Sequence, residues 1–387
     1  MHDFDLVIVG GGLAGASLAV ALRDSRLRVA LVENLPPRPA DGWDVRIYAI
    51  SPANREFLEK IGAWKHLDAQ RLTPIQAMQV FGDGGARLDF SAYASGLSEL
   101  GWILESSLLA CELWESLKRQ GNLSLFSPAR PQALRLSPDS AQLTLDNGAQ
   151  LNARLIVGAD GRDSWVRQTA GIAALTTDYG ERGVVANFAC EHPHRNIARQ
   201  WFSDDGVLAW LPLPGNLVSM VWSTSDAEAD RLCALSAKAL AETVSAAGND
   251  ALGKLQLLTP AVAFPLKLLR VPSLVAPRLA LLGDAAHGIH PLSGHGINLG
   301  FADARELSEQ LIGRRPWQDI GDLRFLQRYQ RARKEEIFLL QNGTDALHRL
   351  FRSSAPGLKP LRNLGLRLTN ALPIVKTALV RYACGSL

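Results

Sequence analysis

The sequence predicts an α/β protein, in which a nucleotide-binding domain of parallel strands carries an inserted antiparallel β-sheet domain and is followed by long helices. Three observations lead to this prediction. An apolar strand pattern, a glycine-rich turn and a helical pattern follow one another over residues 6–23. Short strand patterns with hairpin turns dominate residues 176–272, interrupted by one helical pattern at 226–247, and a further hairpin is expected at residues 75–90. An amphipathic helical pattern extends over residues 323–348.

The composition is that of a globular protein of about two domains. The chain has 387 residues, of which 47% are hydrophobic and 20% are charged, and its net charge is +3. Its Lys and Arg residues form no basic run with interleaved aromatic residues, so nucleic acid is not an expected partner. Four scattered cysteines favour a reducing compartment and a cytoplasmic protein. The apolar run after Asp5 is not expected to be a signal peptide, because acidic residues precede it and glycines interrupt it.

The amino-terminal segment is expected to bind a dinucleotide. Two strand patterns flank a helical pattern, at residues 6–9, 29–32 and 13–23. The turn carries a G-x-G-x-x-G fingerprint, formed by Gly10, Gly12 and Gly15. These glycines let the backbone approach a pyrophosphate at the start of the helix, and Glu33 would hold the adenosine ribose hydroxyls. This Rossmann-type arrangement does not by itself distinguish FAD from NAD.

A second glycine-rich stretch occupies residues 278–303. The apolar run at residues 279–282 predicts a strand that ends in Gly283 and Asp284, and a loop then leads to a helical pattern that begins near Gly296. Asp284 would therefore lie at the carboxyl end of a buried strand, where open α/β sheets bind ligands. The start of the helix offers free N–H groups and a positive dipole end, which suits an anionic or electron-rich ring.

A third strand-and-turn pattern occurs at residues 155–167. The apolar residues 155–157 are followed by Gly158, Asp160 and Gly161, and a helix is expected to start before Arg167. Considered alone, Asp160 is a turn residue and Arg167 is a charge on the surface of a helix.

Together these stretches resemble the flavin motifs of the single-component aromatic hydroxylases, the p-hydroxybenzoate hydroxylase superfamily. The motif G-D-A-A-H, then Pro, then G-x-G-x-N-x-G is matched by Gly283, Asp284, Ala285, Ala286, His287, Pro291, Gly294, Gly296, Asn298 and Gly300. Three further segments resemble the ubiquinone-biosynthesis hydroxylase branch, at residues 209–216, 301–307 and 329–351. The resemblance implies a Rossmann-type FAD-binding domain with an inserted antiparallel β-sheet substrate domain and C-terminal helices.

The resemblance also implies FAD as the cofactor and assigns residues to it. Asp284 would accept a hydrogen bond from a ribityl hydroxyl. The turn and the start of the helix would lie against the pyrimidine side of the flavin, through Gly283, Gly296, Ile297 and Asn298. Arg46 would lie near the ribityl chain and pyrophosphate, with an ordinary surface arginine as the alternative. Asp160 and Arg167 would lie near the pyrophosphate and the path of the nicotinamide donor.

Four residues beside the flavin ring are expected to shape the catalytic pocket: Pro291, Gly294, His295 and Gly296. The branch usually has Gln where this chain has His295. A histidine there could bond to the flavin or substrate, or titrate near neutrality, or it could be a conservative polar replacement. The loop histidines lack the spacing of metal ligands, so no metal site is expected at His287, His290 and His295.

Domain boundaries follow from these patterns. The FAD-binding domain is expected at residues 1–74, 93–175 and 273–345, the substrate domain at 75–92 and 176–272, and a helical tail at 346–387. Trp210 and Phe264 are candidates for the wall of the substrate pocket, with core packing as the alternative. No second G-x-G-x-x-G occurs in the substrate segment, which favours transient binding of the nicotinamide at the flavin.

The tail is basic and amphipathic. It holds seven basic residues between Arg349 and Arg381 and no acidic residue. One face of its last helical pattern is apolar, with Ile374, Val375, Ala378, Leu379 and Tyr382. Such a tail suits the surface of the inner membrane or the proteins of a biosynthetic complex. An ordinary helix packed on the body is the alternative.

The sequence therefore predicts an FAD-dependent monooxygenase that hydroxylates the aromatic ring of a polyprenylated phenol in ubiquinone biosynthesis. The resemblance implies that NAD(P)H or another reductant reduces FAD, and that O2 then forms a C4a-hydroperoxide whose distal oxygen is transferred to the ring. Two alternatives remain open, because fold does not fix substrate: a hydroxylase of a small soluble phenol, and a flavin-binding accessory protein without turnover.

Overall fold

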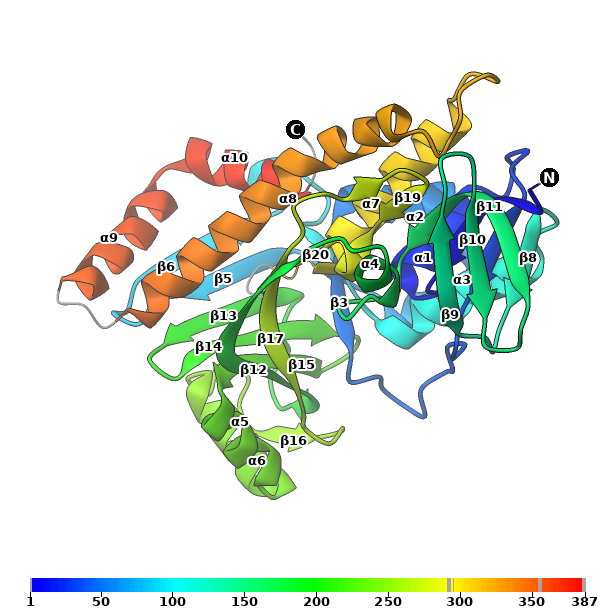
Figure 1. Cartoon of the computed structure of the whole chain (residues 1–387). Helices are drawn as coiled ribbons and strands as arrows, with labels where there is room; N and C mark the ends of the chain where they lie inside the picture. Colours follow the sequence, from blue (N-terminus) through cyan, green and yellow to red (C-terminus); the bar gives the residue numbers. More distant parts are fainter. Residues whose placement is uncertain (1, 291–293, 295, 354–356, 385–387) are drawn as a thin grey trace.

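The structure is a computed structural model that describes residues 2–290, 294, 296–353 and 357–384. Two large β-sheets lie next to each other, and the long helix α8 runs alongside both (Figure 1). The first sheet has the order β18-β19-β11-β1-β2-β8, and β10 and β9 extend it from β11. Its strands are β1 (Phe4–Val9), β2 (Val29–Val32), β8 (Leu123–Phe126), β9 (Pro131–Leu136), β10 (Ala141–Leu145), β11 (Gln150–Gly158), β18 (Val275–Ala276) and β19 (Leu279–Leu281).

The central strands of this sheet are parallel, and the predicted apolar runs form them. The strands β1, β2, β8, β11 and β19 pair in parallel. Every residue of β2 and β19 is buried, as expected for strands that are covered on both faces. The helices that follow them along the chain are α1 (Leu13–Ala21), α2 (Pro52–Lys60), α3 (Ser106–Lys118), α4 (Trp165–Thr169) and α7 (Gly296–Ile312).

Glycines allow α7 to approach α1 and the turn after β19 closely. A Cβ atom at Gly300 would lie 3.2 Å from the Cβ of Ala14 and 3.4 Å from the Cα of Gly283. The first turn of α7 is thereby held beside the turn that begins at Gly283. Two glycine-rich segments far apart in the sequence thus meet at one edge of the sheet.

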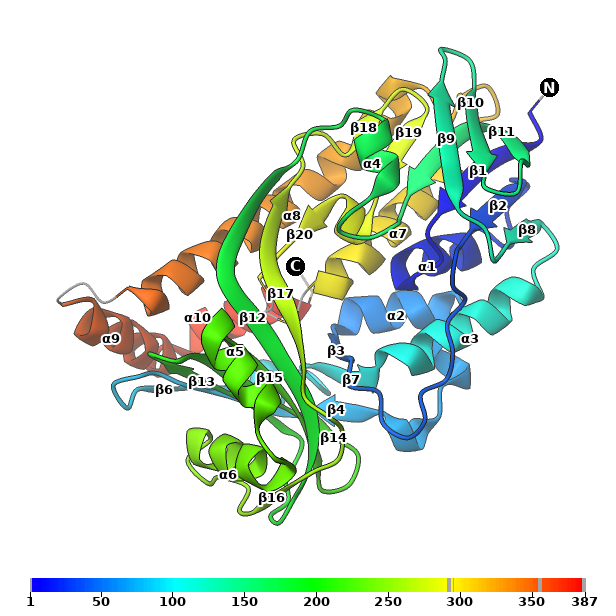
Figure 2. The same cartoon turned by 60° about the horizontal axis from the view of Figure 1, so that its bottom comes forward.

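The second sheet is the inserted one. Its order is β20-β17-β12-β15-β14-β13-β5-β6, and β16 pairs with β12. Two long curved strands, β12 and β17, connect it to the first domain (Figure 2). The strands are β5 (Ala77–Phe81), β6 (Arg87–Ser91), β12 (Leu175–Cys190), β13 (Ile197–Ser203), β14 (Gly206–Leu213), β15 (Leu217–Ser225), β16 (Leu255–Leu257), β17 (Val262–Arg270) and β20 (His287–Gly288).

The predicted α/β class with an inserted antiparallel sheet is confirmed, with one parallel junction. β5 and β6 form the predicted hairpin, but β5 pairs with β13 in parallel. The reason is topological, since the chain passes through the first domain between Ser91 and Leu175 and forms β12 before it reaches β13. β20 also joins this sheet, although it lies in a segment predicted for the FAD-binding domain. The predicted domain boundaries stay a prediction.

One face of the second sheet is covered by α5 (Asp226–Ala234) and α6 (Ala237–Ala247), which replace the single helix expected from the sequence. The helices separate because Leu235 is extended and the hydroxyl of Ser236 accepts a hydrogen bond from the N–H of Ala239. A three-stranded sheet was not predicted at all, because its strands are too short to show a period; they are β3 (Ile47–Ile50), β7 (Gly101–Glu105) and β4 (Thr73–Ile75).

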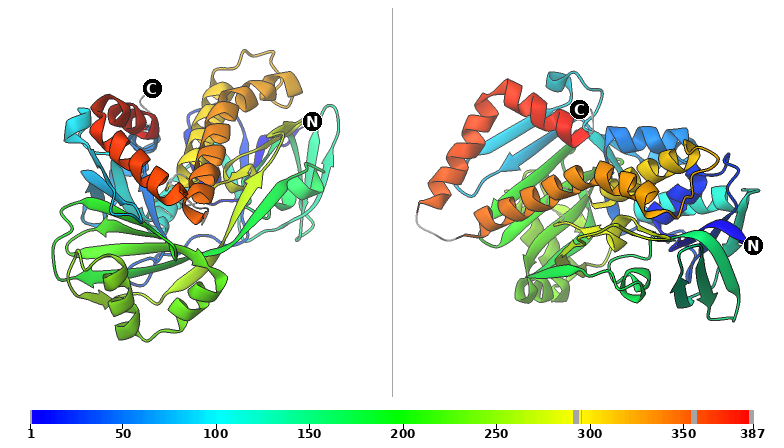
Figure 3. Two further views of the ribbon diagram at one scale, coloured as in Figure 1. Left: turned by 90° about the vertical axis from the view of Figure 1, so that its left-hand side faces the viewer. Right: turned by 45° about the horizontal axis from the view of Figure 1, so that its top comes forward.

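The carboxyl-terminal part of the chain is helical, with α8 (Leu323–Arg352), α9 (Leu358–Ala371) and α10 (Pro373–Cys384). α8 continues through residue 346, where the tail was expected to begin. Figure 3 shows α9 and α10 beside the hairpin of β5 and β6. The Asn363 carboxamide on α9 accepts a hydrogen bond from the N–H of Gly84 at 3.0 Å. None of the described helices combines the length and the apolar character needed to cross a bilayer.

Candidate active site

The carboxyl ends of four parallel strands are aligned at one edge of the first sheet. Their last residues pair with one another, Val9 with Val32 and Gly158, and Gly158 with Leu281. Residues of the three predicted motifs follow these ends: Gly10, Glu33, Asp160 and Asp284. The topology therefore gathers these segments at the edge where open α/β sheets bind ligands.

The three glycines of the amino-terminal turn are required for different reasons. Gly10 has a φ of +106°, and a Cβ there would lie 2.3 Å from the carbonyl oxygen of Ala159. At Gly15, a Cβ would lie 2.0 Å from the carbonyl oxygen of Gly10. At Gly12, which precedes α1, a Cβ would meet no atom within 4 Å. Gly12 thus borders open space beside the first-turn N–H groups of α1, which fits the approach of a pyrophosphate.

Glu33 closes the same turn. Its Oε2 accepts a hydrogen bond from the N–H of Gly11 at 2.6 Å, and its Oε1 accepts one from the N–H of Leu35 at 2.9 Å. A carboxylate has about four acceptor sites, so this half-buried group can still accept hydrogen bonds from two ribose hydroxyls. The predicted role of Glu33 is compatible with this geometry.

Asp284 lies exposed just after β19, as the strand pattern indicated. The preceding Gly283 has a φ of +59°, and a Cβ there would lie 3.2 Å from the Cβ of Ala14. Burial raises the pKa of Tyr48 on β3, and the nearby charge of Asp284 raises it further. The Asp284 carboxylate is thus open to solvent next to β3, where it can accept a hydrogen bond from a bound polyol chain.

Asn298 fixes the start of α7, because its side chain forms hydrogen bonds with neighbouring protein groups. Its Oδ1 accepts hydrogen bonds from the N–H of Ser51 at 2.9 Å and from the Nδ2 of Asn54 at 3.0 Å, while its Nδ2 donates to the carbonyl of Ala49 at 2.7 Å. The Asn298 side chain therefore anchors α7 to β3 and α2, and the predicted contact of Asn298 with the cofactor stays a prediction. The backbone N–H groups from Gly296 to Asn298 remain available to a ligand.

Arg46 and Phe264 meet where the two domains adjoin. The guanidinium carbon of Arg46 lies 5.0 Å from the centroid of the Phe264 ring. Phe264 is half-buried on β17, whereas its neighbour Ala263 packs into the core beneath α5 and α6. Because adjacent strand residues point to opposite faces, Phe264 faces the first domain. Arg46 is exposed, and its charge and that of Asp284 have opposite effects on the pKa of Tyr48.

Comparison with known proteins agrees with this geometry. The FAD binding domain family matches residues 3–337. A 3-demethoxyubiquinol 3-hydroxylase of Escherichia coli (strain K12) is 34% identical over 385 residues, which are 98% of each chain. Ubiquinone hydroxylase UbiL of Rhodospirillum rubrum is 36% identical over 388 residues, covering 99% of this chain and 90% of the relative. The chain belongs to the ubiquinone-biosynthesis hydroxylase family of FAD-dependent monooxygenases.

Solved structures support the same fold for this family member. PqsL from Pseudomonas aeruginosa, described as a probable FAD-dependent monooxygenase, superimposes with a TM-score of 0.79 at 24% identity and covers 94% of this chain and 99% of its own. The p-nitrophenol 4-monooxygenase PnpA from Pseudomonas putida DLL-E4 gives a TM-score of 0.79 at 18% identity and covers 100% of this chain and 99% of its own. The resemblance inferred from the flavin motifs is confirmed.

A buried ion-pair network that was not predicted lies behind the flavin motif of this monooxygenase. Asp303 on α7 accepts hydrogen bonds from the N–H of Gly283 at 2.9 Å and from Nε2 of His287 at 2.6 Å. The Nε of Arg333 on α8 donates to its other oxygen at 2.7 Å. Burial alone would raise the pKa of Asp303, but the charges of His287 and Arg333 lower it overall. Its spacing was a signal for a buried ion pair, because Asp303 lies four residues from both Leu299 and Leu307 and therefore on the buried face of α7.

The side chains of Arg167 and Asp160 both form hydrogen bonds within the protein. Arg167 is buried, and its guanidinium donates to the carbonyls of Ala285 and Arg162, each at 2.9 Å. It thus supports the turn after Asp284, and its predicted place near the pyrophosphate and the nicotinamide path stays a prediction. Asp160 caps α4, because its Oδ1 accepts from the Ser164 hydroxyl at 2.5 Å and its Oδ2 from the N–H of Val166 at 3.0 Å. Burial raises the pKa of Asp160.

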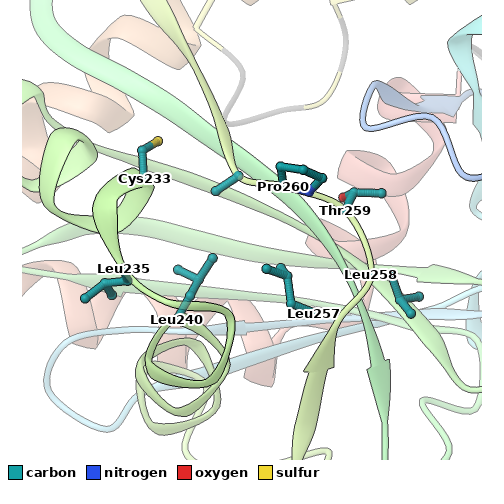
Figure 4. Close-up of a pocket in the computed structure, with 8 residues that line it drawn as sticks. Cys233, Leu235, Leu240, Leu257, Leu258, Thr259 and Pro260 are labelled. Atoms are coloured by element: carbon teal, nitrogen blue, oxygen red, sulfur yellow. The ribbon is translucent and has the colours of Figure 1, made fainter.

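Trp210 is a core residue, which corrects its assignment to the substrate pocket. Its side chain is 1% exposed and packs against Gly248 at the end of α6, where a Cβ would lie 2.3 Å from the indole ring. It therefore points away from the flavin motifs, into the core between the second sheet and its helices. A cavity of about 320 Å³ borders the same helices and is lined by Cys233, Leu235, Leu240 and residues 257–261 (Figure 4).

Of the four predicted catalytic residues, the structure describes Gly294 and Gly296. Gly294 is exposed with a φ of +63°, and a Cβ at Gly296 would meet no atom within 4 Å. Both positions therefore leave room beside the start of α7. Pro291 and His295 lie outside the described residues, so their predicted roles stay predictions.

Proposed function

We propose that this monooxygenase hydroxylates the aromatic ring of a polyprenylated phenol in ubiquinone biosynthesis, with NAD(P)H as electron donor and O2 as co-substrate. The observation that carries the proposal is the match, over nearly the whole chain, to relatives named for hydroxylation in ubiquinone biosynthesis. Human ubiquinone biosynthesis monooxygenase COQ6, a mitochondrial protein, is also 30% identical over 98% of the chain. Such coverage includes the substrate domain as well as the nucleotide-binding segments.

The residues at the sheet edge fit FAD part by part. The N–H groups after Gly12 suit the pyrophosphate, Glu33 the adenosine ribose, and Asp284 a ribityl hydroxyl. The first-turn N–H groups of α7 suit the electron-rich edge of the ring, since a helix start stabilises negative charge. Bound FAD supplies the hydride acceptance and O2 activation that no side chain can provide.

The protein's own task is then to orient the phenol and keep water away from the ring carbon that reacts. Phe264 offers an aromatic surface on the substrate sheet that faces Arg46, and the guanidinium above it carries a positive charge. A phenol gains nucleophilicity as it loses its proton, and a nearby cation favours the phenolate. We assign Phe264 to the pocket wall and Arg46 to the cofactor-proximal edge of the pocket. Gly294, Gly296, Pro291 and His295 complete its predicted rim.

The surface of the C-terminal helices suits a prenylated substrate at a membrane. More than half of the large hydrophobic side chains exposed among the described residues lie on α8, α9 and α10: Phe338, Leu339, Leu347, Leu361, Leu364, Leu368, Ile374, Val375, Leu379 and Tyr382. Leu372, between α9 and α10, is exposed as well. Basic residues accompany them, and no acid occurs from residue 347 to the end of the chain. An apolar face with basic flanks binds an anionic bilayer surface, from which a polyprenyl chain can be withdrawn.

Quinone intermediates from a host without its own ring hydroxylases test this function. We expect that expression of the chain yields prenylated intermediates heavier by one oxygen in mass spectrometry. Asp284→Ala should abolish these species because the carboxylate that suits the ribityl chain is lost, whereas Asp139→Ala, at an exposed position remote from the site, should not. Unchanged intermediates in cells that contain soluble, FAD-loaded protein would contradict the proposal and favour a small soluble phenol or an accessory role.

A further inference from the structure

Three buried side chains from distant parts of the chain meet in a cluster. Glu181 lies on β12, His290 follows β20, and His348 lies on α8. Their exposed fractions are 4%, 0% and 9%. One carboxylate oxygen and one ring nitrogen from each histidine lie within 4.8 Å of one another. The cluster joins the substrate sheet, the loop before α7 and the C-terminal helix.

The spacing of these atoms matches that of ligands around one metal ion. The Nε2 of His348 lies 3.1 Å from Oε2 of Glu181, and the Nε2 of His290 lies 3.6 Å from the same oxygen. Zinc bonds to nitrogen and oxygen ligands are about 2.0–2.1 Å long, so ligands at tetrahedral angles lie about 3.3 Å apart. The two observed separations bracket this value.

We propose that Glu181, His290 and His348 bind a divalent transition-metal ion, with Zn²⁺ as the best fit. Two imidazoles and one carboxylate form a common zinc donor set, and a water molecule would complete four-coordination. The ion would tie α8 and β12 to His290, which precedes the loop before α7. This inference does not depend on the proposed substrate.

The surroundings hold the three ligands in this arrangement. The Nε of Arg352 lies 2.9 Å from Oε1 of Glu181, so the guanidinium occupies one carboxylate oxygen and Oε2 faces the two histidines. The Tyr179 ring packs edge-on against His290, with centroids 5.0 Å apart, and lies 4.5 Å from the ring of His348. Partners of this kind orient metal ligands.

The charges around the cluster set how strongly it can bind a cation. Among the three proposed ligands, Glu181 supplies the carboxylate that attracts a cation, and the Nε of Arg352 lies 2.9 Å from its Oε1. Arg352 opposes a cation, while Asp345, which accepts a hydrogen bond from the Tyr179 hydroxyl at 3.2 Å, adds a second negative charge nearby. The Asp345 charge is shared with Arg270 at 3.6 Å and Arg349 at 3.2 Å.

Metal content of the untagged, full-length, FAD-loaded protein tests the proposal. After equilibration with Zn²⁺ and dialysis, we expect about one zinc ion per chain, and a loss of affinity of at least about tenfold in Glu181→Gln and in His348→Gln. His66→Gln is the matched control, because that exposed histidine pairs with Glu112 by a similar 2.9 Å contact outside the cluster. It should retain the metal.

X-ray absorption at the zinc edge of the wild-type protein provides a reading that does not depend on the folding of any variant. Two imidazoles with oxygen ligands at about 2.0–2.1 Å would support the site. A wild-type protein that retains no zinc would overturn the proposal, and the cluster would then be a hydrogen-bonded network. Zinc with sulfur or phosphate ligands, or zinc retained equally in both ligand variants, would overturn it as well.

Discussion

Gly12 and Gly15 lie three residues apart in one turn, yet the structure gives them opposite consequences for substitution. A methyl group at Gly15 would collide with the backbone of Gly10, whereas a methyl group at Gly12 would meet only open space. The first glycine-rich turn therefore contains one position required by the fold and one required by the ligand.

This difference predicts that Gly12→Ala weakens FAD binding without unfolding the protein. We expect FAD affinity to fall by roughly tenfold or more, because the methyl group takes the space of the pyrophosphate approach, while the stability of the FAD-free protein changes by less than about 1 kcal/mol. Flavin fluorescence titration and urea unfolding measure the two quantities. Gly15→Ala should instead destabilise the FAD-free protein. Unchanged FAD affinity in Gly12→Ala would argue against this binding site.

Among the residues of the site, we expect loss of the Asp303 carboxylate to lower the free energy of unfolding most. Asp303→Asn leaves the buried Arg333 guanidinium with only the partly exposed Glu336 as an acidic partner, so we expect a loss of about 3–5 kcal/mol in unfolding free energy at pH 7. Asp139→Asn, at an exposed position, is the control and should change it by less than about 0.5 kcal/mol. Equal stability of both variants would contradict the account of the network.

The same carboxylate predicts a pH dependence. Its pKa in the folded protein is lowered, so its contribution to stability is complete above the value of an unfolded aspartate, about 3.9, and is lost as the pH falls through the lower folded value. The stability difference between wild type and Asp303→Asn should therefore shrink as the pH falls below about 4. A difference that already shrinks between pH 7 and pH 5 would show that another group controls it.

At the scale of elements, the two helices of the tail, α9 and α10, differ in how they pack. α9 packs as an ordinary helix, since Arg362 and Asn363 both bond to Asp83 in the β5–β6 hairpin. α10 instead exposes its apolar face, and the side chain of Ile374 is 87% exposed. The tail is thus docked through one helix and presents the apolar side of the next to its surroundings.

We expect the double substitution Ile374→Glu and Leu379→Glu to reduce binding to anionic vesicles at least about tenfold, because each loses roughly 1.5–3 kcal/mol of apolar burial in the bilayer. The free energy of unfolding should change by less than about 0.5 kcal/mol, because both side chains are exposed. Leu35→Glu, which alters a side chain that is 71% exposed in the other domain, is the control. Vesicle co-sedimentation that is equal for all three proteins would exclude this surface as the membrane contact.

The elements with a clear period or punctuation could be predicted, and the others could not. The strands before Gly10 and Gly283, the β5–β6 hairpin and the long α8 follow from apolar runs, turn residues and helical spacing. The break at Ser236 was hidden because the apolar spacing continues through it. The parallel pairing of β5 with β13 depends on the path of the chain through the other domain, which no local pattern records.

At the scale of the whole molecule, some parts of the site could be predicted from local patterns and others could not. Residues at strand ends were predictable, because topology aligns such ends at one edge of a parallel sheet. Contacts between distant segments were not, as with Asp303 and Arg333, or Glu181 and His348. Three further contacts were not indicated by local patterns: the polar groups of Arg167 and Asn298 and the ring of Trp210 all meet protein atoms.

The central claim is that the chain transfers one atom of O2 to a prenylated aromatic ring. The most direct measurement is mass spectrometry of the product formed by the purified, FAD-loaded protein from a prenylated phenol, NAD(P)H and ¹⁸O2. The account predicts that the new ring hydroxyl carries ¹⁸O, that the second atom leaves as water, and that one NAD(P)H is oxidised for each product. NAD(P)H oxidation that yields only hydrogen peroxide, or a hydroxyl that derives from water, would contradict it.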